Sequence, residues 1–127
     1  MKRFFRRMRS RIRDFKFNIK IRLQRKFRGY SDDEVWDLGY STLYWMLPRL
    51  KAYRKNLMGH PMPLTSNQWE AYVDKLIAAI ELLAADRDGT LPPDEFGQPR
   101  YGLNVEEYEQ IDEALRLLGF WILAIWD

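Results

Sequence analysis

The chain has 127 residues, which is enough for one domain with a buried core, and it contains no cysteine, which excludes disulfides and thiolate metal sites. Its aromatic content of 15%, including five tryptophans, requires a core or an interface that buries aromatic rings. Charge divides the chain: residues 1–28 hold thirteen Lys and Arg against one acid, whereas residues 29–127 hold eight bases and seventeen acids. This division predicts a basic arm (residues 1–28) that has an anionic partner, joined to a second domain (residues 29–127).

The first predicted element covers most of the basic arm. Residues 14–27, DFKFNIKIRLQRKF, alternate apolar and polar positions as a strand does, yet apolar residues also recur every three or four positions, as on one face of a helix. A lone strand would leave its backbone groups unpaired, and the sequence offers no comparable second strand. We therefore predict a basic amphipathic helix from about Arg3 to Phe27. Its apolar positions are Phe4, Met8, Ile12, Phe15, Ile19, Leu23 and Phe27.

The second predicted helix begins at a capping box. Ser31 is followed three residues later by Glu34, and acids fill the first turn, where the helix dipole favours them. The apolar period then continues to a stop near Met58 or Gly59. Pro48 lies inside this pattern and lacks a backbone donor, so it predicts a kink near residues 44–47 or a break.

Two further helices are predicted, with a long loop between them. The third begins at the capping box of Thr65 and Gln68 and ends near Ala85, and the fourth begins at Asn104. Residues 86–103 are rich in Gly and Pro and predict a loop whose length is typical of a functional or mobile segment. Its Asp-x-Asp-Gly start resembles a calcium loop but lacks the rest of the ligand pattern, so an ordinary turn is expected.

These elements predict an all-α fold, an antiparallel helical bundle of about four helices with a basic amphipathic N-terminal helix and a long loop before the last helix. Residues 120–126, FWILAIW, form the longest apolar run, far below the roughly 20 residues that span a bilayer. No secretory signal is predicted either, because no apolar segment follows the basic start. The run offers more apolar surface than one small bundle needs, which predicts a homo-oligomer.

No constellation of residues predicts catalysis. The paired acids at residues 32–34 and 112–113 fall at a helix start or on an outer face, where capping and solvation explain them. The sequence has no glycine-rich phosphate loop, zincin motif or nucleophile elbow. His60 is the only histidine, and alone it cannot define a metal site. We therefore expect a protein that is not an enzyme and that has no catalytic residue, metal or cofactor.

Basic and aromatic side chains define a candidate site for an anionic partner. Guanidinium groups beside aromatic rings hold phosphates and nucleobases, and a basic amphipathic helix binds lipid headgroups or a nucleic-acid backbone. Two alternatives remain open: a solvated face with the tryptophans in the core, and a first helix packed on the acidic body. The candidate residues are Arg6, Arg9, Arg13, Arg28, Arg49, Lys51, Arg54 and Lys75, with Trp36, Trp45 and Trp69 as aromatic contacts and His60 as a polar contact.

Five segments together resemble a family of small proteins encoded by tailed bacteriophages and prophages. They are RGYSDDEVWDL (residues 28–38), LPRLKAY (47–53), GHP (59–61), LTSNQWEAYVDKLIAAIEL (64–82) and LRLLGFWILAIWD (115–127). Many members of that family have an aspartate where this chain has Gly39. The resemblance implies a phage accessory protein in the cytoplasm of the bacterial host, and it supplies no catalytic residues.

Combined with the charge pattern, the resemblance implies a non-catalytic phage accessory protein. It would bind an anionic partner (a nucleotide signal, a nucleic acid or a host protein) and modulate or inhibit a host process such as antiviral defence. One alternative is a membrane-surface protein docked through its basic N-terminal helix. The other is a nucleic-acid-binding module of phage replication or packaging.

Overall fold

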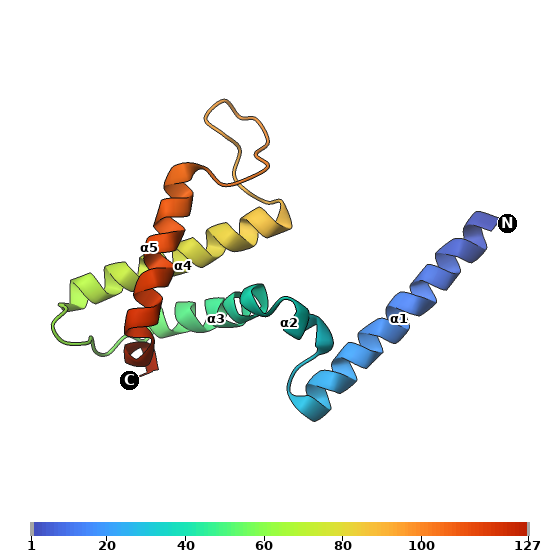
Figure 1. Ribbon diagram of the computed structural model, residues 1–127, viewed down its shortest axis with the longest axis horizontal. Coiled ribbons are helices and arrows are strands. Elements are labelled where there is room, and N and C mark those ends of the chain that lie inside the picture. Colours follow the sequence, from blue (N-terminus) through green and yellow to red (C-terminus); the bar gives the residue numbers. More distant parts are fainter. Residues whose placement is uncertain (1, 127) are drawn as a thin grey trace. The chain divides into compact units, whose positions relative to one another are not determined.

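The computed structural model describes residues 2–126, with the side chains of residues 7–123 and 125. The chain is 75% helical and forms the predicted all-α helical bundle (Figure 1). Its helices are α1 (Lys2–Arg28), α2 (Asp32–Trp36), α3 (Leu38–Lys55), α4 (Ser66–Asp88) and α5 (Val105–Trp121), followed by the 3-10 helix η1 (Ile122–Trp126). The chain divides into two compact units: unit 1 extends to Ser41, and unit 2 begins at Thr42.

The long helix of unit 1 is α1, which confirms the helical interpretation of residues 3–27. Its last turn carries Arg25, Lys26 and Arg28, whose positive charges interact favourably with the negative end of the helix dipole. Gly29 ends the helix with a φ of 80°, a left-handed conformation that costs glycine little. The N–H of Gly29 donates to the carbonyl of Arg25 at 3.0 Å, which satisfies one of the terminal carbonyl groups.

The capping box predicted at Ser31 is present and starts α2. The backbone N–H of Ser31 donates to the carboxylate of Glu34 at 2.6 Å, and the fully buried Ser31 hydroxyl donates to the same carboxylate at 2.8 Å. The carboxylate of Glu34 also forms an ion pair with the guanidinium of Arg25 in α1, with Nε and Oε1 3.3 Å apart. The hydrogen bonds from Ser31 are the main reason that the pKa of Glu34 lies below its usual value.

A cluster around Asp32 holds α2 to α1. The carboxylate of Asp32 accepts from Arg28 at 2.7 Å and from the Gln24 amide at 2.7 Å, and Lys20 lies 3.4 Å away. The Gln24 carbonyl in turn accepts from the backbone N–H of Asp32 at 3.0 Å. The bonds from Arg28 and Gln24 lower the pKa of Asp32 to about 2. These contacts join α2 to α1 in one compact unit, whereas the sequence places a domain boundary after Arg28.

The helix break in this region lies at Asp37, eleven residues before the proline that was expected to cause it. A single helix was predicted from Ser31 to about Met58, with Pro48 producing a kink or a break, and both the single helix and a break at Pro48 are wrong. The chain instead leaves the helical conformation at Asp37, whose φ of −129° and ψ of 49° separate α2 from α3. Helix α3 then continues through Pro48 and ends at Lys55. A proline inside a helix removes one hydrogen bond, which the packing of α3 in unit 2 tolerates.

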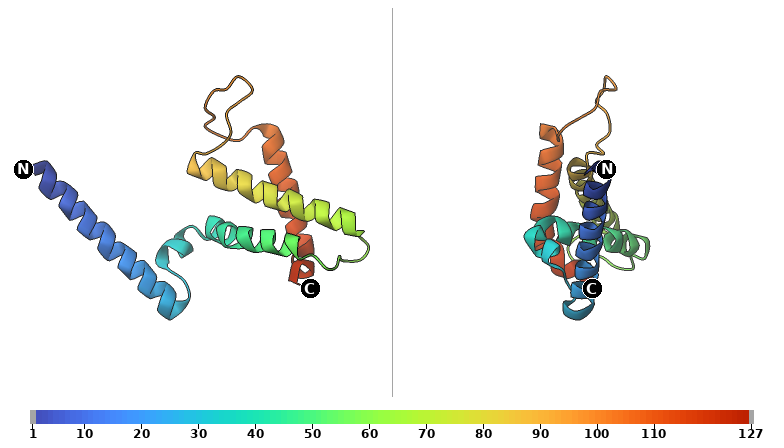
Figure 2. Two further views of the ribbon diagram at one scale, coloured as in Figure 1. Left: turned by 180° about the vertical axis from the view of Figure 1, so that it is seen from behind. Right: turned by 90° about the vertical axis from the view of Figure 1, so that its right-hand side faces the viewer.

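Unit 2 contains the helical packing that forms the core. From Thr42 onward, α3 runs antiparallel to α4, and α5 crosses α4 rather than following it (Figure 1). The view from behind shows the same crossing (Figure 2). Helix α4 supplies most of the buried side chains, because its apolar residues face both α3 and α5. The buried apolar residues are Leu50, Trp69, Tyr72, Val73, Leu76, Ala79, Ile80, Ile111 and Ala114.

The predicted boundaries of α4 and α5 are close to those observed. The side-chain oxygens of Thr65 and Asn104 accept from the backbone N–H groups three residues on, at 3.2 and 2.8 Å, so both predicted capping boxes are present. Helix α4 extends three residues beyond Ala85 and ends at Gly89, whose φ of 68° favours glycine. The predicted loop is thus confined to residues 89–104.

The apolar C-terminal run divides between core and surface. Trp121 and Ile125 pack against the core, whereas Phe120 and Leu123 are exposed. Among the described residues, none of the helices is both long enough and apolar enough to cross a membrane.

Candidate functional site

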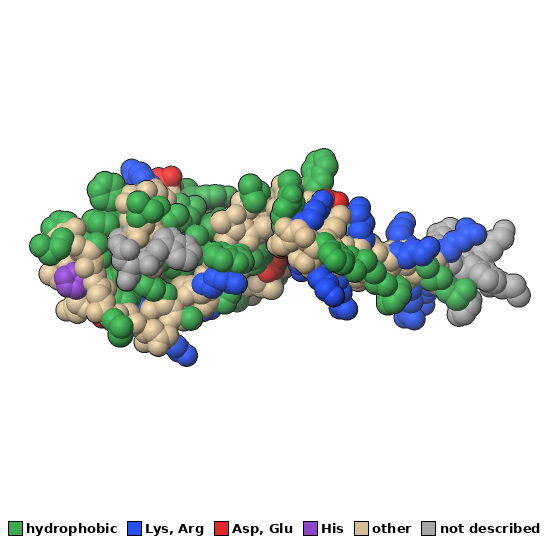
Figure 3. Space-filling model, turned by 90° about the horizontal axis from the view of Figure 1, so that it is seen from below, with side chains coloured by type: hydrophobic (Ala, Val, Ile, Leu, Met, Phe, Trp, Pro, Cys, Tyr) green, Lys and Arg blue, Asp and Glu red, His purple; other side chains and the backbone are tan. Residues whose placement is uncertain are grey.

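Helix α1 carries an apolar stripe flanked by bases. Within unit 1, the helices leave this stripe uncovered, and its side chains are between 41% and 78% exposed. The stripe consists of Met8, Ile12, Phe15, Ile19, Leu23 and Phe27. Figure 3 shows hydrophobic side chains along this helix with Lys and Arg side chains on either side of them. A helix with this distribution is suited to an interface that is apolar on one side and anionic on the other.

The bases of α1 fall into two groups. Arg9 and Arg13, both predicted to bind an anion, are exposed, and no carboxylate of unit 1 pairs with either of them. Arg28 instead pairs with Asp32, and its guanidinium lies 4.8 Å from the centre of the Tyr30 ring. The side chain of Arg6, also predicted, lies outside the described residues. The N-terminal half of α1 therefore keeps its charge available to a partner.

Two of the bases predicted on the second helix are engaged with α4. Lys51 pairs with Glu81 at 2.5 Å, and Arg54 pairs with Asp74 at 2.8 Å and with Glu70 at 3.2 Å. These pairs join α3 to α4, so Lys51 and Arg54 do not form a free positive surface. Sequence reasoning missed them because the acids are 16 to 30 residues away in the chain and meet the bases only across the helix contact.

The predicted ligand contact of Trp69 is wrong. Trp69 has no exposed surface, and its indole N–H donates to the Tyr53 hydroxyl at 3.1 Å. It also packs against Tyr72 and Trp121, with ring centres 5.3 and 6.2 Å away. Trp69 is therefore a core residue, which agrees with the alternative of buried tryptophans. Trp36, by contrast, is 90% exposed on α2.

The remaining polar candidates, His60 and Lys75, belong to different elements. His60 and Lys75 are exposed, His60 in the loop before α4 and Lys75 on α4 itself. Among the described residues, no group of three or more His, Asp or Glu side chains could hold a metal ion.

The loop at residues 89–104 is organised by its own polar groups. Asp94 accepts from the backbone N–H groups of Phe96 and Gln98 at 2.9 and 2.7 Å. Arg100 donates to Glu107 at 2.5 Å, which fixes the end of the loop to the start of α5. An open hollow of about 670 Å³ lies beside these groups. Two of its polar lining residues, Asp94 and Arg100, are the ones that hold the loop itself.

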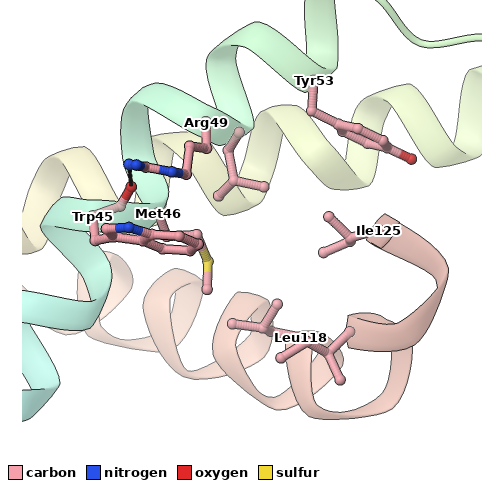
Figure 4. A pocket seen from close by; sticks show the side chains of 8 residues that line it. Trp45, Met46, Arg49, Tyr53, Leu118 and Ile125 are labelled. Atoms are coloured by element: carbon pink, nitrogen blue, oxygen red, sulfur yellow. Dashed lines mark hydrogen bonds between the residues drawn. The ribbon is translucent and has the colours of Figure 1, made fainter. Parts of the chain in front are cut away.

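One predicted pair lies at the edge of a cavity in unit 2. The guanidinium of Arg49 lies 4.1 Å from the centre of the Trp45 ring and donates to the Trp45 carbonyl at 2.8 Å (Figure 4). Beside this pair is a cavity of about 110 Å³ between α3 and the end of the chain. Its lining comprises Trp45, Met46, Arg49, Leu50, Tyr53, Leu118, Ile122 and Ile125.

Sequence reasoning found only part of this arrangement. Trp45 and Arg49 were selected because they are aromatic and basic, whereas Leu118 and Ile125 were not among the candidate residues. No local signal links them to α3, because the cavity exists only once the two helices pack together.

Comparison with known proteins gives no match to this chain, whether with family models, curated proteins or solved structures. The functional inference therefore rests on the surfaces of α1 and on the cavity beside Arg49.

Proposed function

We propose that this chain is a non-catalytic phage accessory protein that binds an anionic partner through α1. The observation that carries the proposal is the exposed apolar stripe of α1, beside which Arg9 and Arg13 are exposed and pair with no carboxylate among the described residues of unit 1. The phage assignment rests on the resemblance of the five sequence segments. Binding of this kind would modulate a host process in the bacterial cytoplasm, antiviral defence being the leading candidate.

The exposed stripe favours an anionic membrane surface as the partner. An interfacial helix buries its apolar face about 5–10 Å into the boundary between headgroups and acyl chains, while each nearby base adds about 1 kcal/mol on anionic lipid. Phe15 is 66% exposed and Phe27 is 78% exposed, so both would gain from this burial. Pairing of two α1 helices through their stripes is disfavoured, because it would bring together two strongly positive helices.

Nucleic acid is the second candidate, and the exposed guanidinium groups of Arg9 and Arg13 favour it. Such groups can follow a phosphate backbone, with binding that weakens steeply as salt is added. This mode does not use the apolar stripe, which would remain in contact with water. The two candidates therefore differ in whether the stripe contributes to binding.

Vesicle flotation and DNA titration of the full chain distinguish these candidates. The vesicles contain phosphatidylglycerol and phosphatidylcholine or phosphatidylcholine alone, and duplex DNA is titrated at about 50 mM salt, where electrostatic binding is strong. Phe15→Ser removes a stripe residue. Phe17→Ser is its matched control, because Phe17 is 55% exposed but lies two positions away and so faces a different side of the helix.

Membrane docking predicts binding to the anionic vesicles only, weakened about ten-fold by Phe15→Ser and little changed by Phe17→Ser. Tight DNA binding that is equal for both variants, without vesicle binding, would support the second candidate. A full chain that binds neither vesicles nor DNA at low salt would overturn the proposed function.

A further inference from the structure

We infer that the cavity between α3 and the C-terminal helices is a binding site for a small carboxylate that carries a compact apolar group. This inference goes beyond the proposed function, because every residue that carries it lies in unit 2 and none belongs to α1.

The first argument is the apolar character of the cavity. Side chains of Met46, Leu118 and Ile125 point into the space between the helices (Figure 4). An apolar cavity of about 150 Å³ binds a benzene ring. The cavity beside Arg49 has a volume of about 110 Å³. By proportion with the six carbons of benzene, it would hold an apolar group of about four or five carbon atoms.

The second argument is the cation at its edge. Among the described residues that line the cavity, Arg49 alone is charged and none carries a carboxylate. Lys51 and Arg54, on the same helix, pair with acids of α4, whereas no carboxylate of the described residues pairs with Arg49. Arg49 thus differs from its neighbours in having an uncompensated charge beside an apolar space.

The third argument is that Arg49 is held in position. Its guanidinium stacks on the Trp45 ring, and one of its N–H groups donates to the Trp45 carbonyl. Both residues belong to the part of α3 that contains Pro48, whose ring crowds the preceding turn. A guanidinium has five N–H donors in a fixed plane, so most of them remain for a ligand. Because the Arg49 side chain is already fixed before a ligand binds, less conformational entropy is lost on binding.

Together these features define the ligand class. A carboxylate can form a charge-assisted hydrogen bond with Arg49 while its apolar group fills the cavity. An amine would be repelled by Arg49. A sugar or a dicarboxylate would bury polar groups that the apolar lining cannot satisfy. A single cation at the edge matches a ligand with a single negative charge.

The test is an NMR titration of the ¹⁵N-labelled full chain with 4-methylpentanoate. We expect saturable shifts confined to residues lining the cavity, including the Trp45 indole N–H. Arg49→Gln should weaken binding about ten-fold, the usual effect of losing a charge-assisted hydrogen bond. Lys75→Gln is the matched control, because it removes an exposed base from unit 2 that does not line the cavity.

Two further probes separate the two parts of the site. The uncharged 4-methylpentanamide should bind more weakly than the carboxylate and with the same affinity to wild type and Arg49→Gln. Acetate, which lacks the apolar group, should not produce saturable shifts. The inference is overturned if 4-methylpentanoate causes no saturable shift at the lining residues, or if Arg49→Gln and Lys75→Gln bind it equally well. None of these results depends on whether α1 binds vesicles or DNA.

Discussion

Two tyrosines of unit 2 are expected to respond in opposite directions to the same substitution. The Tyr53 hydroxyl accepts the hydrogen bond of the fully buried Trp69 indole at 3.1 Å. The Tyr72 hydroxyl is also buried, but no group of the described residues hydrogen-bonds it. Burial raises the pKa of Tyr72 to about 12, which reflects the same separation from water. Tyr53→Phe therefore removes a needed partner, whereas Tyr72→Phe removes a polar group that has none.

The magnitudes follow from burial. Tyr53→Phe keeps the ring and leaves the Trp69 N–H without its hydrogen-bond partner, in a side chain that has no exposed surface. An unsatisfied buried donor costs about 1–3 kcal/mol, so we expect a loss of about 2 kcal/mol in the free energy of unfolding. Tyr72→Phe removes a buried hydroxyl that has no hydrogen-bond partner among the described residues and that therefore destabilises the folded protein. The free energy of unfolding should be unchanged or rise by up to about 1 kcal/mol.

Urea unfolding monitored by tryptophan fluorescence measures both effects, since Trp69 lies in the unit that is perturbed. With a slope of about 1–3 kcal/mol per molar urea, Tyr53→Phe should lower the midpoint by about 1 M, and Tyr72→Phe should leave it the same or raise it. An equal loss of stability in both variants would refute the reasoning. It would mean that the hydroxyls act through packing alone and that the hydrogen bond between Tyr53 and Trp69 is not what stabilises the core.

Three further outcomes are expected. Arg54→Ala should lower the free energy of unfolding modestly, because its partly exposed ion pairs join α3 to α4, and the loss should shrink at high salt in a urea series. Hydrogen bonds from Arg100 lower the pKa of Glu107 below 4.5, so its stabilisation is complete above that pH and is lost as the pH falls through the lowered value. Glu107→Gln should therefore remove part of the acid sensitivity in a series of urea unfolding curves, and an unchanged pH dependence would count against this pair. Replacing the exposed Phe120 and Leu123 with Ser should lower the mass of a homo-oligomer by light scattering, and an unchanged mass would exclude this surface as the interface.

The elements set by local interactions could be predicted from the sequence. Ser31, Thr65 and Asn104 each start a helix because the residue three positions later completes a capping box. The two members of each box are close in the sequence, so the pattern can be read without knowledge of the fold. The helical period of α1 likewise needs no information from the rest of the protein. The break at Asp37 gave no comparable signal, whereas Pro48 gave a strong one that packing overrode.

The candidate sites were predictable only in part, for the same physical reason. The stripe and bases of α1 belong to one helix, so their arrangement follows from spacing alone. Lys51 and Arg54 pair with acids of α4, whereas Arg49 stacks on Trp45 beside a cavity that α5 and η1 complete, so the tertiary contacts decide which charges are neutralised. Trp69 was misassigned because spacing does not show which of several aromatic residues fills the centre of the core.

The contacts around Asp32 also give α1 an electrical polarity. Residues 7–16 hold five bases and one acid, and residues 20–28 hold five bases, of which Lys20, Arg25 and Arg28 pair with acids of α2. The positive field of the helix is therefore concentrated in its N-terminal half, where the helix dipole adds to it. Near a negative surface this asymmetry produces a torque that turns residues 7–16 toward the surface first. Encounter would then proceed from the N-terminal half, with the apolar stripe settling afterwards along the length of the helix.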